Sequence, residues 1–188
     1  MSGLLSVDVR HDAKAIRSVL AGYQRGADVV LVRTLNRVMP SVKSRAAVEL
    51  SKQLGVKRSV AAKALFTSRA FTGRLSTDMG ASTKRIPLIQ FAARQTRAGV
   101  TYKIGQGPRR LLPRAFINVA RGFGPSVLRR VEEDGRLVPR YPIFVKYGPS
   151  PAARFIQDTF MKLLDTTARE RWTRELSAQL KFFLSKQP

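Results

Sequence analysis

Three short segments of this 188-residue sequence carry residue types that could perform chemistry. In the first, Gly105–Arg110, closely spaced glycines precede two arginines, faintly like a phosphate-binding loop. The segment lacks the Gly-Lys-Ser/Thr ending of that loop, and it continues into Leu111, Leu112 and Pro113 rather than into a helix start. The pattern therefore favours a flexible basic hairpin loop.

The second segment is the acidic trio Glu132, Glu133 and Asp134, which could be read as a magnesium site. Adjacent carboxylates on a turn repel one another and face water, and no second cluster of oxygen ligands accompanies them. We therefore expect a solvated turn between Val131 and Leu137 and no bound metal.

The third segment, Ala46–Phe66, resembles a helix-turn-helix, because an apolar helix, a turn at Gly55 and a short basic helix follow one another. In that interpretation four residues would face a DNA major groove: Lys57, Arg58, Ser59 and Lys63. A helix-turn-helix needs compact helical neighbours, whereas a strongly basic, strand-rich segment follows here. We therefore keep DNA binding through this segment, as a regulator or packaging accessory, only as the alternative to the main functional prediction at the end of this section.

The composition argues against catalysis. The chain has no Cys, which excludes thiolate metal sites and Cys nucleophiles, and its single His, His11, lies beside Asp12 near the N-terminus as a solvated residue would. A zinc site or a His-based triad therefore has no support. We expect a non-enzymatic protein with no catalytic residues, no metal and no cofactor.

The net charge of +23 is the strongest single feature of the sequence. It comes from 35 Lys and Arg against 12 Asp and Glu, and residues 66–148 alone hold 16 basic and 4 acidic groups. Most of the excess is Arg, whose planar fork suits phosphate and carboxylate. Such a field favours a polyanion, usually nucleic acid, and the alternative is an acidic protein neighbour.

Helical periodicity dominates both ends of the chain. A long helix is predicted from Asp12, with Asp8 or Asp12 as its N-cap, a kink or break at Pro40 and an αL C-cap at Gly55. Its apolar stripe is Ile16, Val19, Leu20, Tyr23, Ala27, Val30, Leu31, Leu35 and Val38, resuming at Val42, Ala46, Ala47 and Leu50. A short helix is expected from Ser59 to about Phe66.

At the other end, Ser150 is expected to cap a single C-terminal helix that starts with Pro151. Its predicted stripe is Phe155, Ile156, Phe160, Leu163, Leu164, Ala168, Trp172, Leu176 and Leu180.

The middle of the chain reads as strands. The predicted strands are 86–92 with Pro87 at a sheet edge, 100–104 after a turn at Gly99, 115–120, 127–131 and 141–145. The expected fold class is α+β, with a long N-terminal helix, a central mostly antiparallel sheet and a C-terminal helix. One domain over 1–188 is predicted, helical over 12–66, sheet-rich over 67–147 and helical over 150–184. No apolar run is long enough to span a membrane.

Several segments, taken in order, resemble the minor tail protein Z family of tailed bacteriophages. The signature stretch is Ile86–Val100 (IPLIQFAARQTRAGV), and Val32–Arg37 (VRTLNR) resembles the family's helix with an Ala/Leu-Asn-Arg motif. The later pieces are Pro113–Ile117, Val127–Arg130, Arg140, Pro142 and Ile143, and Gly148–Ser150. The match covers most of the chain from Val29 to Leu184, and the N-terminal segment and Pro40 depart from the family's pattern.

The resemblance implies a structural virion protein of the tail or neck, assembled in the host cytoplasm, that acts in tail completion and head–tail joining. Its partners would be other neck and tail proteins, packaged DNA contacted without sequence preference, and copies of itself in a ring of about six subunits. The residues expected to contact DNA or a partner are Arg94, Arg97, Lys103, Arg109, Arg110 and Arg114. The residues expected at the subunit interface are Ile16, Leu20, Tyr23 and Ala27.

Overall fold

The computed structural model describes residues 4–8, 24–119, 124–130, 132–133, 136–137 and 143–185, and side chains within 26–119, 124–130 and 143–185. These residues group into two compact units. The first, here called the helical unit, draws on Met1–Ala47, Leu65–Ala81 and Phe155–Pro188. The second, here called the strand-rich unit, draws on Val48–Ala64 and Ser82–Arg154. The single-domain organisation stays a prediction.

The long helix α2 runs from Gln24 to Leu54. From Ala27 to Leu50 its predicted apolar stripe is buried as expected, with Leu31 and Val42 both 0% exposed, whereas Ile16, Val19, Leu20 and Tyr23 lie outside the described side chains. Of the kink or break predicted at Pro40, the break is wrong, because the helix continues through this residue, and the kink stays a prediction. Proline removes one helical hydrogen bond at a cost of about 3 kcal/mol. Val38, Met39 and Val42 are buried on either side of it, and their packing offsets that cost.

The end of α2 confirms the predicted cap. Gly55 has a φ of +72°, and its amide and that of Val56 donate to the Ser51 carbonyl at 2.9 and 3.2 Å. The Ser51 hydroxyl donates to the Val56 carbonyl at 2.7 Å, which closes the turn. The helix that follows, α3, covers only Arg58–Lys63. The prediction that it would reach Phe66 is wrong, because β2 takes Leu65–Thr67.

A three-stranded antiparallel sheet belongs to the helical unit. It consists of β1 (Leu4–Asp8), β2 and β3 (Ser76–Ala81), in the order β1-β3-β2. No strand was expected at 4–8, and Asp8 is no helix cap, because it pairs with Ser76. The Phe66 ring covers Gly80 on the adjacent strand, where a Cβ would lie 2.4 Å from a ring carbon. A larger residue at position 80 would therefore displace this ring, which is half exposed.

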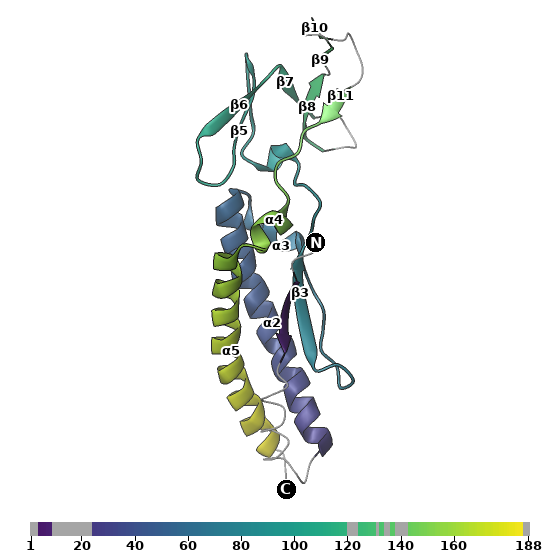
Figure 1. Ribbon diagram of the computed structural model, residues 1–188, viewed down its shortest axis with the longest axis vertical. Coiled ribbons are helices and arrows are strands. Elements are labelled where there is room, and N and C mark those ends of the chain that lie inside the picture. The colour runs from purple at the N-terminus through teal and green to yellow at the C-terminus, as the bar shows by residue number, and fades with distance from the viewer. Residues whose placement is uncertain are drawn as a thin grey trace. The chain divides into compact units, whose positions relative to one another are not determined.

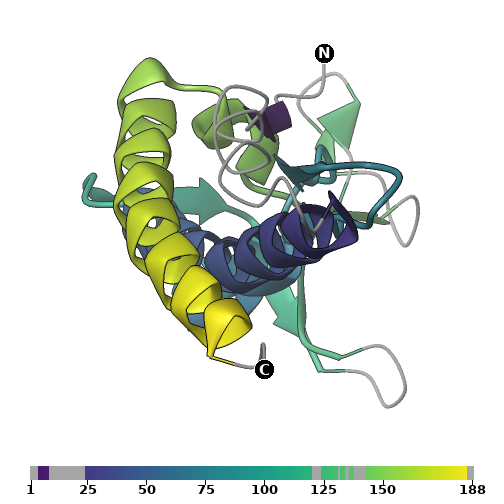
Figure 2. The same cartoon turned by 90° about the horizontal axis from the view of Figure 1, so that it is seen from below.

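The C-terminal segment forms two helices instead of the predicted one. The first, α4 (Pro151–Phe155), starts at the expected proline, and α5 (Asp158–Leu184) follows after extended backbone at Gln157 (φ −69°, ψ 134°). Ile156, predicted in the apolar stripe, is 52% exposed at this break. In the helical unit α5 lies alongside α2 (Figures 1 and 2), with Phe160 and Leu164 in the core.

Short antiparallel strands are the main regular elements of the strand-rich unit. One sheet has the order β4-β5-β6, with β4 at Arg94–Thr96, β5 at Gly99–Lys103 and β6 at Arg109–Pro113. Another has the order β11-β8-β7, with β7 at Ala115–Asn118, β8 at Ser126–Arg130 and β11 at Ile143–Val145. A further pair joins β9 (Glu132–Glu133) to β10 (Arg136–Leu137). The α+β fold class is confirmed, with its strands in several small sheets.

The predicted strand at 86–92 is wrong. This segment forms a single bridge between Pro87 and Tyr147, followed by the 3₁₀ turn η1 (Leu88–Gln90). The bonds of this bridge come from the residues that flank Pro87 and Tyr147, so the missing N–H of Pro87 costs no bond, and the pairing stops because the chain turns into η1 at Leu88. The Leu88 amide donates to the Lys146 carbonyl at 2.9 Å, and the Gly148 amide donates to the Ile86 carbonyl at 2.8 Å.

Candidate nucleic-acid or partner interface

The register of the β4-β5-β6 sheet sorts its side chains onto two faces. Thr101 lies opposite Arg94, and Lys103 lies opposite Arg109. Opposite residues share a face, and so do residues two apart along a strand, so Arg94, Lys103 and Arg109 point the same way. We call these three residues the basic face. Val100 points the other way and is 0% exposed, so the basic face is the one turned away from the core.

All six predicted contact residues are exposed, but the structure does not bring them onto one surface. Arg97 and Arg114 lie at the opposite end of the sheet from Lys103, about 13 Å along β5 at roughly 3.3 Å per residue. Arg110 pairs with Tyr102 and therefore belongs to the opposite face. The basic face thus gathers three of the six.

The loop between β5 and β6, the segment faintly like a phosphate loop, is attached to the end of α2. The Gly105 amide donates to the Leu54 carbonyl at 2.8 Å, and the Gly107 amide donates to the Ile104 carbonyl at 3.2 Å. Both glycine amides are therefore satisfied within the chain. A Cβ on Gly55 would lie 2.7 Å from the Gly105 nitrogen, so the approach depends on glycine. The loop positions the hairpin that carries Lys103 and Arg109.

The positive charges of the basic face have no carboxylates near them in the sequence. No Asp or Glu occurs between Asp78 and Glu132. The Arg109 guanidinium donates to the Ala92 carbonyl at 3.0 Å and to the Thr101 hydroxyl at 3.3 Å, which holds it against the sheet. Within the described parts of the chain, Arg94, Lys103 and Arg109 form no ion pair with a carboxylate. Their charge is available to an external anion.

Gln95, which sequence reasoning missed, connects the two larger sheets of the strand-rich unit. Its amide oxygen accepts from the Ile117 amide at 2.8 Å, and its amide nitrogen donates to the Gly99 carbonyl at 3.3 Å. A second contact joins the signature stretch to Gly148. The Phe91 ring packs directly against this glycine, and a Cβ on Gly148 would lie 2.4 Å from a ring carbon. Within the strand-rich unit, Ile86–Val100 therefore contacts two of the later segments of the resemblance, Pro113–Ile117 and Gly148–Ser150.

Comparison with protein families gives one match. The model of the prophage minor tail protein Z (GPZ) family covers residues 12–186. The chain belongs to this family. Neither the curated proteins nor the solved structures gave a match. Membership identifies the chain as a structural protein of a bacteriophage tail and as a virion component, as the sequence predicted.

Metal-binding clusters and membrane-spanning helices would indicate other classes of protein. Among the described residues, no three or more His, Cys, Asp or Glu come together as a metal site would require. No helix within the described residues is long and apolar enough to cross a membrane. His11 and Asp134 lie outside the described residues, as do the side chains of Glu132 and Glu133.

The helix that would serve as the recognition helix of a helix-turn-helix, α3, is too short for that role. Lys57, Arg58, Ser59 and Lys63 are exposed, but α3 has only six residues, less than two helical turns. The chain then enters strand β2, so no longer helix can lie in a major groove from this segment.

The predicted subunit interface is largely beyond what the structure describes. Ile16, Leu20 and Tyr23 lie outside the described residues. Ala27 is 0% exposed within the helical unit's own core, so its side chain has no free surface for a neighbour. The use of the first three residues as an interface stays a prediction.

The Leu-Asn-Arg motif of α2 has a structural role at Asn36. Its amide nitrogen donates to the Ala70 carbonyl at 3.0 Å, and its amide oxygen accepts from the Ala70 amide at 3.0 Å. Asn36 therefore satisfies both backbone groups of a residue that is only 5% exposed.

We expect Asn36→Ala to lower the free energy of unfolding by about 2–4 kcal/mol, because it leaves two buried backbone groups without partners. Urea denaturation followed by circular dichroism measures this loss. Asn118→Ala is the matched control, since Asn118 is exposed at the end of β7 and should change stability by about 0.5 kcal/mol at most. Equal stability of the two variants would contradict the assigned role.

Proposed function

We propose that this minor tail protein completes the tail at its junction with the head, as a ring around the DNA channel. The basic face supports this proposal: three exposed cations on one sheet face, with no carboxylate nearby in sequence, suit the phosphates of DNA or the acidic surface of a ring neighbour. The protein acts without catalysis and without a cofactor, and other tail proteins are its partners.

Contacts of this kind carry no sequence information. Phosphate contacts orient a protein on DNA, and they lose affinity steeply as salt displaces them. Arg97 and Arg114 extend the same field at the other end of the sheet, and Arg110 extends it on the opposite face. The expected mode is therefore non-specific and salt-dependent.

The test compares two triple variants that each remove three positive charges. In the basic-face variant, Arg94, Lys103 and Arg109 are replaced by Gln, and in the control variant Lys57, Arg58 and Lys63 are replaced by Gln. Binding to a 30-base-pair duplex is measured by fluorescence anisotropy from low to high salt. We expect the basic-face variant to bind about tenfold more weakly and its dependence of log K on log salt to flatten by about 2–3, roughly 0.9 per lost contact.

The control variant should keep most of its affinity and slope. A larger loss in the control variant would assign DNA binding to the helix-turn-helix-like segment, and strong selection of one sequence would contradict the non-specific mode. Negative-stain images of the purified protein, alone and with tail tubes, test the ring separately. Rings or caps at tube ends support it, and a monomer that ignores tube ends contradicts it.

A further inference from the structure

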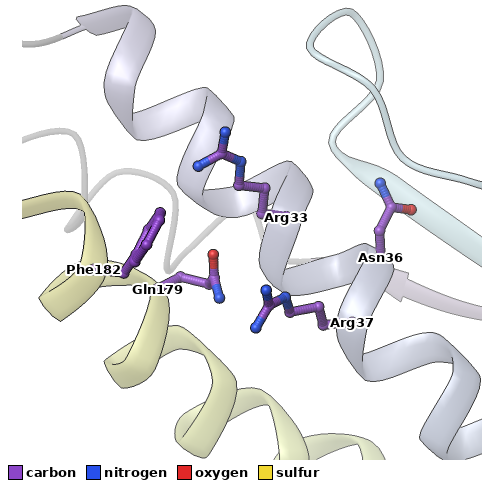
Figure 3. Close-up of a pocket in the computed structure, with 5 residues that line it drawn as sticks. All are labelled: Arg33, Asn36, Arg37, Gln179 and Phe182. Carbon is purple, nitrogen blue, oxygen red and sulfur yellow. The ribbon is translucent and has the colours of Figure 1, made fainter. Parts of the chain in front are cut away.

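A pocket of about 470 Å³ opens between α2 and α5 in the helical unit. We call it the α2–α5 pocket. The residues that line it are Arg33, Asn36, Arg37, Gln179 and Phe182 (Figure 3). It shares no residue with the basic face, so its function is a separate question.

Two cations lie on one side of this pocket. Arg33 and Arg37 are four residues apart on α2, a spacing that places both on one face of the helix. In Figure 3 both side chains extend towards the α5 side, whereas Asn36 points the opposite way, towards its partner Ala70. Both arginines are exposed, and neither forms an ion pair within the described residues. Their two planar guanidinium groups can therefore bind an anion from outside the chain.

A buried amide faces the same opening from α5. Gln179 is only 5% exposed, and its side chain makes no hydrogen bond with any described residue. Among the described residues, the one fully buried side-chain polar atom without a partner is Oε1 of Gln53, so the Gln179 amide is not sealed off from solvent. A ligand that accepts from the Gln179 amide nitrogen would add a hydrogen bond that the chain itself does not supply.

The remaining wall is apolar. Phe182, one turn of α5 beyond Gln179, is 46% exposed and lines the opening. The pocket thus combines two guanidinium forks, one buried amide donor and the face or edge of a ring. This set matches a carboxylate carried on a short stem with an apolar residue beside it.

We propose that the α2–α5 pocket binds an acidic side chain of a neighbouring tail protein, flanked by an apolar residue that packs on Phe182. A duplex presents its phosphates on a convex surface and is met by an open track of cations. A recess with a buried amide and a ring suits a single carboxylate better. The proposal extends the assembly function to a second contact surface and does not rest on the basic face.

The experiment uses the full chain and a fluorescein-labelled peptide, Gly-Ser-Leu-Glu-Phe-Glu-Leu-Ser-Gly, at 0.15 M salt. A second peptide with Gln in place of both Glu tests the need for carboxylate. The variants are Arg33→Gln, Arg37→Gln and Gln179→Met, which keeps the side-chain volume. Arg45→Gln is the matched control, because it removes the same charge from the same helix at an exposed position outside the pocket.

We expect the Glu peptide to bind and the Gln peptide to bind at least tenfold more weakly. Each pocket variant should weaken binding of the Glu peptide by about tenfold, and Arg45→Gln by less than twofold. In the NMR spectrum of the whole protein, the Gln179 side-chain amide should shift on addition of the Glu peptide. Variants are compared only after their circular dichroism spectra match that of the parent.

Three results would overturn the proposal. The first is no binding of the Glu peptide, and the second is an equal loss in Arg45→Gln, which would assign binding to net charge alone. The third is a 30-base-pair duplex that binds through Arg33 and Arg37 while the peptide does not, which would make the site a DNA contact. Failure of the basic-face variant leaves these readouts unchanged, so the two proposals are tested independently.

Discussion

Replacing Gly99 with Ala is expected to lower the free energy of unfolding by about 3 kcal/mol or more and to abolish binding through the basic face. Gly99 begins β5 with a φ of +145°, a conformation that is essentially restricted to glycine. A Cβ there would also lie 2.2 Å from the Leu112 carbonyl oxygen of β6. Because that contact is to backbone, β5 and β6 must separate, and Lys103 and Arg109 lose their register.

Gly124→Ala is the control that separates the cost of a positive φ from the cost of the steric clash with β6 in Gly99→Ala. Gly124 also has a positive φ, +58°, but a Cβ there meets nothing within 4 Å. Its replacement should therefore show the conformational cost alone, about 1 kcal/mol. Urea denaturation and duplex binding are measured on both variants. If Gly99→Ala is no less stable than Gly124→Ala, the close approach of β5 and β6 does not control the sheet.

Leu31→Asp is expected to lower the free energy of unfolding by about 4 kcal/mol or more, a large part of the roughly 5–15 kcal/mol that ordinary proteins have. Leu31 is 0% exposed in the core of the helical unit, so the substitution removes apolar packing and places a carboxylate where nothing solvates it. Leu184→Asp is the control, because Leu184 is 55% exposed at the end of α5 and should tolerate the same charge. Thermal unfolding followed by circular dichroism compares the two.

The same stripe offers a test of assembly at its N-terminal end. We expect Leu20→Asp to fold and yet to fail to enter tails, because Leu20 is predicted at the subunit interface. Complementation of a phage that lacks the protein measures entry into particles. If Leu20→Asp unfolds the protein, Leu20 belongs to the core. If infectious particles contain the variant, the prediction that Leu20 lies at a subunit interface is wrong.

Local patterns in the sequence determined the buried stripe of α2, its C-cap and the family. The 3.6-residue spacing predicted which side chains of α2 are buried, since a long amphipathic helix needs only one apolar partner surface. Gly55 marked the end of that helix because an αL cap depends on a single residue. The ordered segments from Val32 to Ser150 indicated the minor tail protein Z family, and the family match over residues 12–186 confirmed it.

Other features depended on partners far away in the sequence. The 86–92 segment has the composition of a strand, but it forms only one bridge, between Pro87 and Tyr147, because the chain turns into η1 at Leu88. Pro40 remains inside α2 because the buried residues around it outweigh one lost hydrogen bond. Asn36 could not be distinguished from a solvated helix residue until Ala70 was placed beside it.

The candidate sites show the same division. The sequence by itself determined that Arg94, Lys103 and Arg109 belong to a strongly basic, carboxylate-free region, because charge is a property of composition. Only the tertiary structure decided that these three share one face and that Arg110 does not, since a shift of one residue in strand register would exchange the faces. Arg33, Arg37 and Gln179 meet only because α5 packs on α2, more than 140 residues further along the chain.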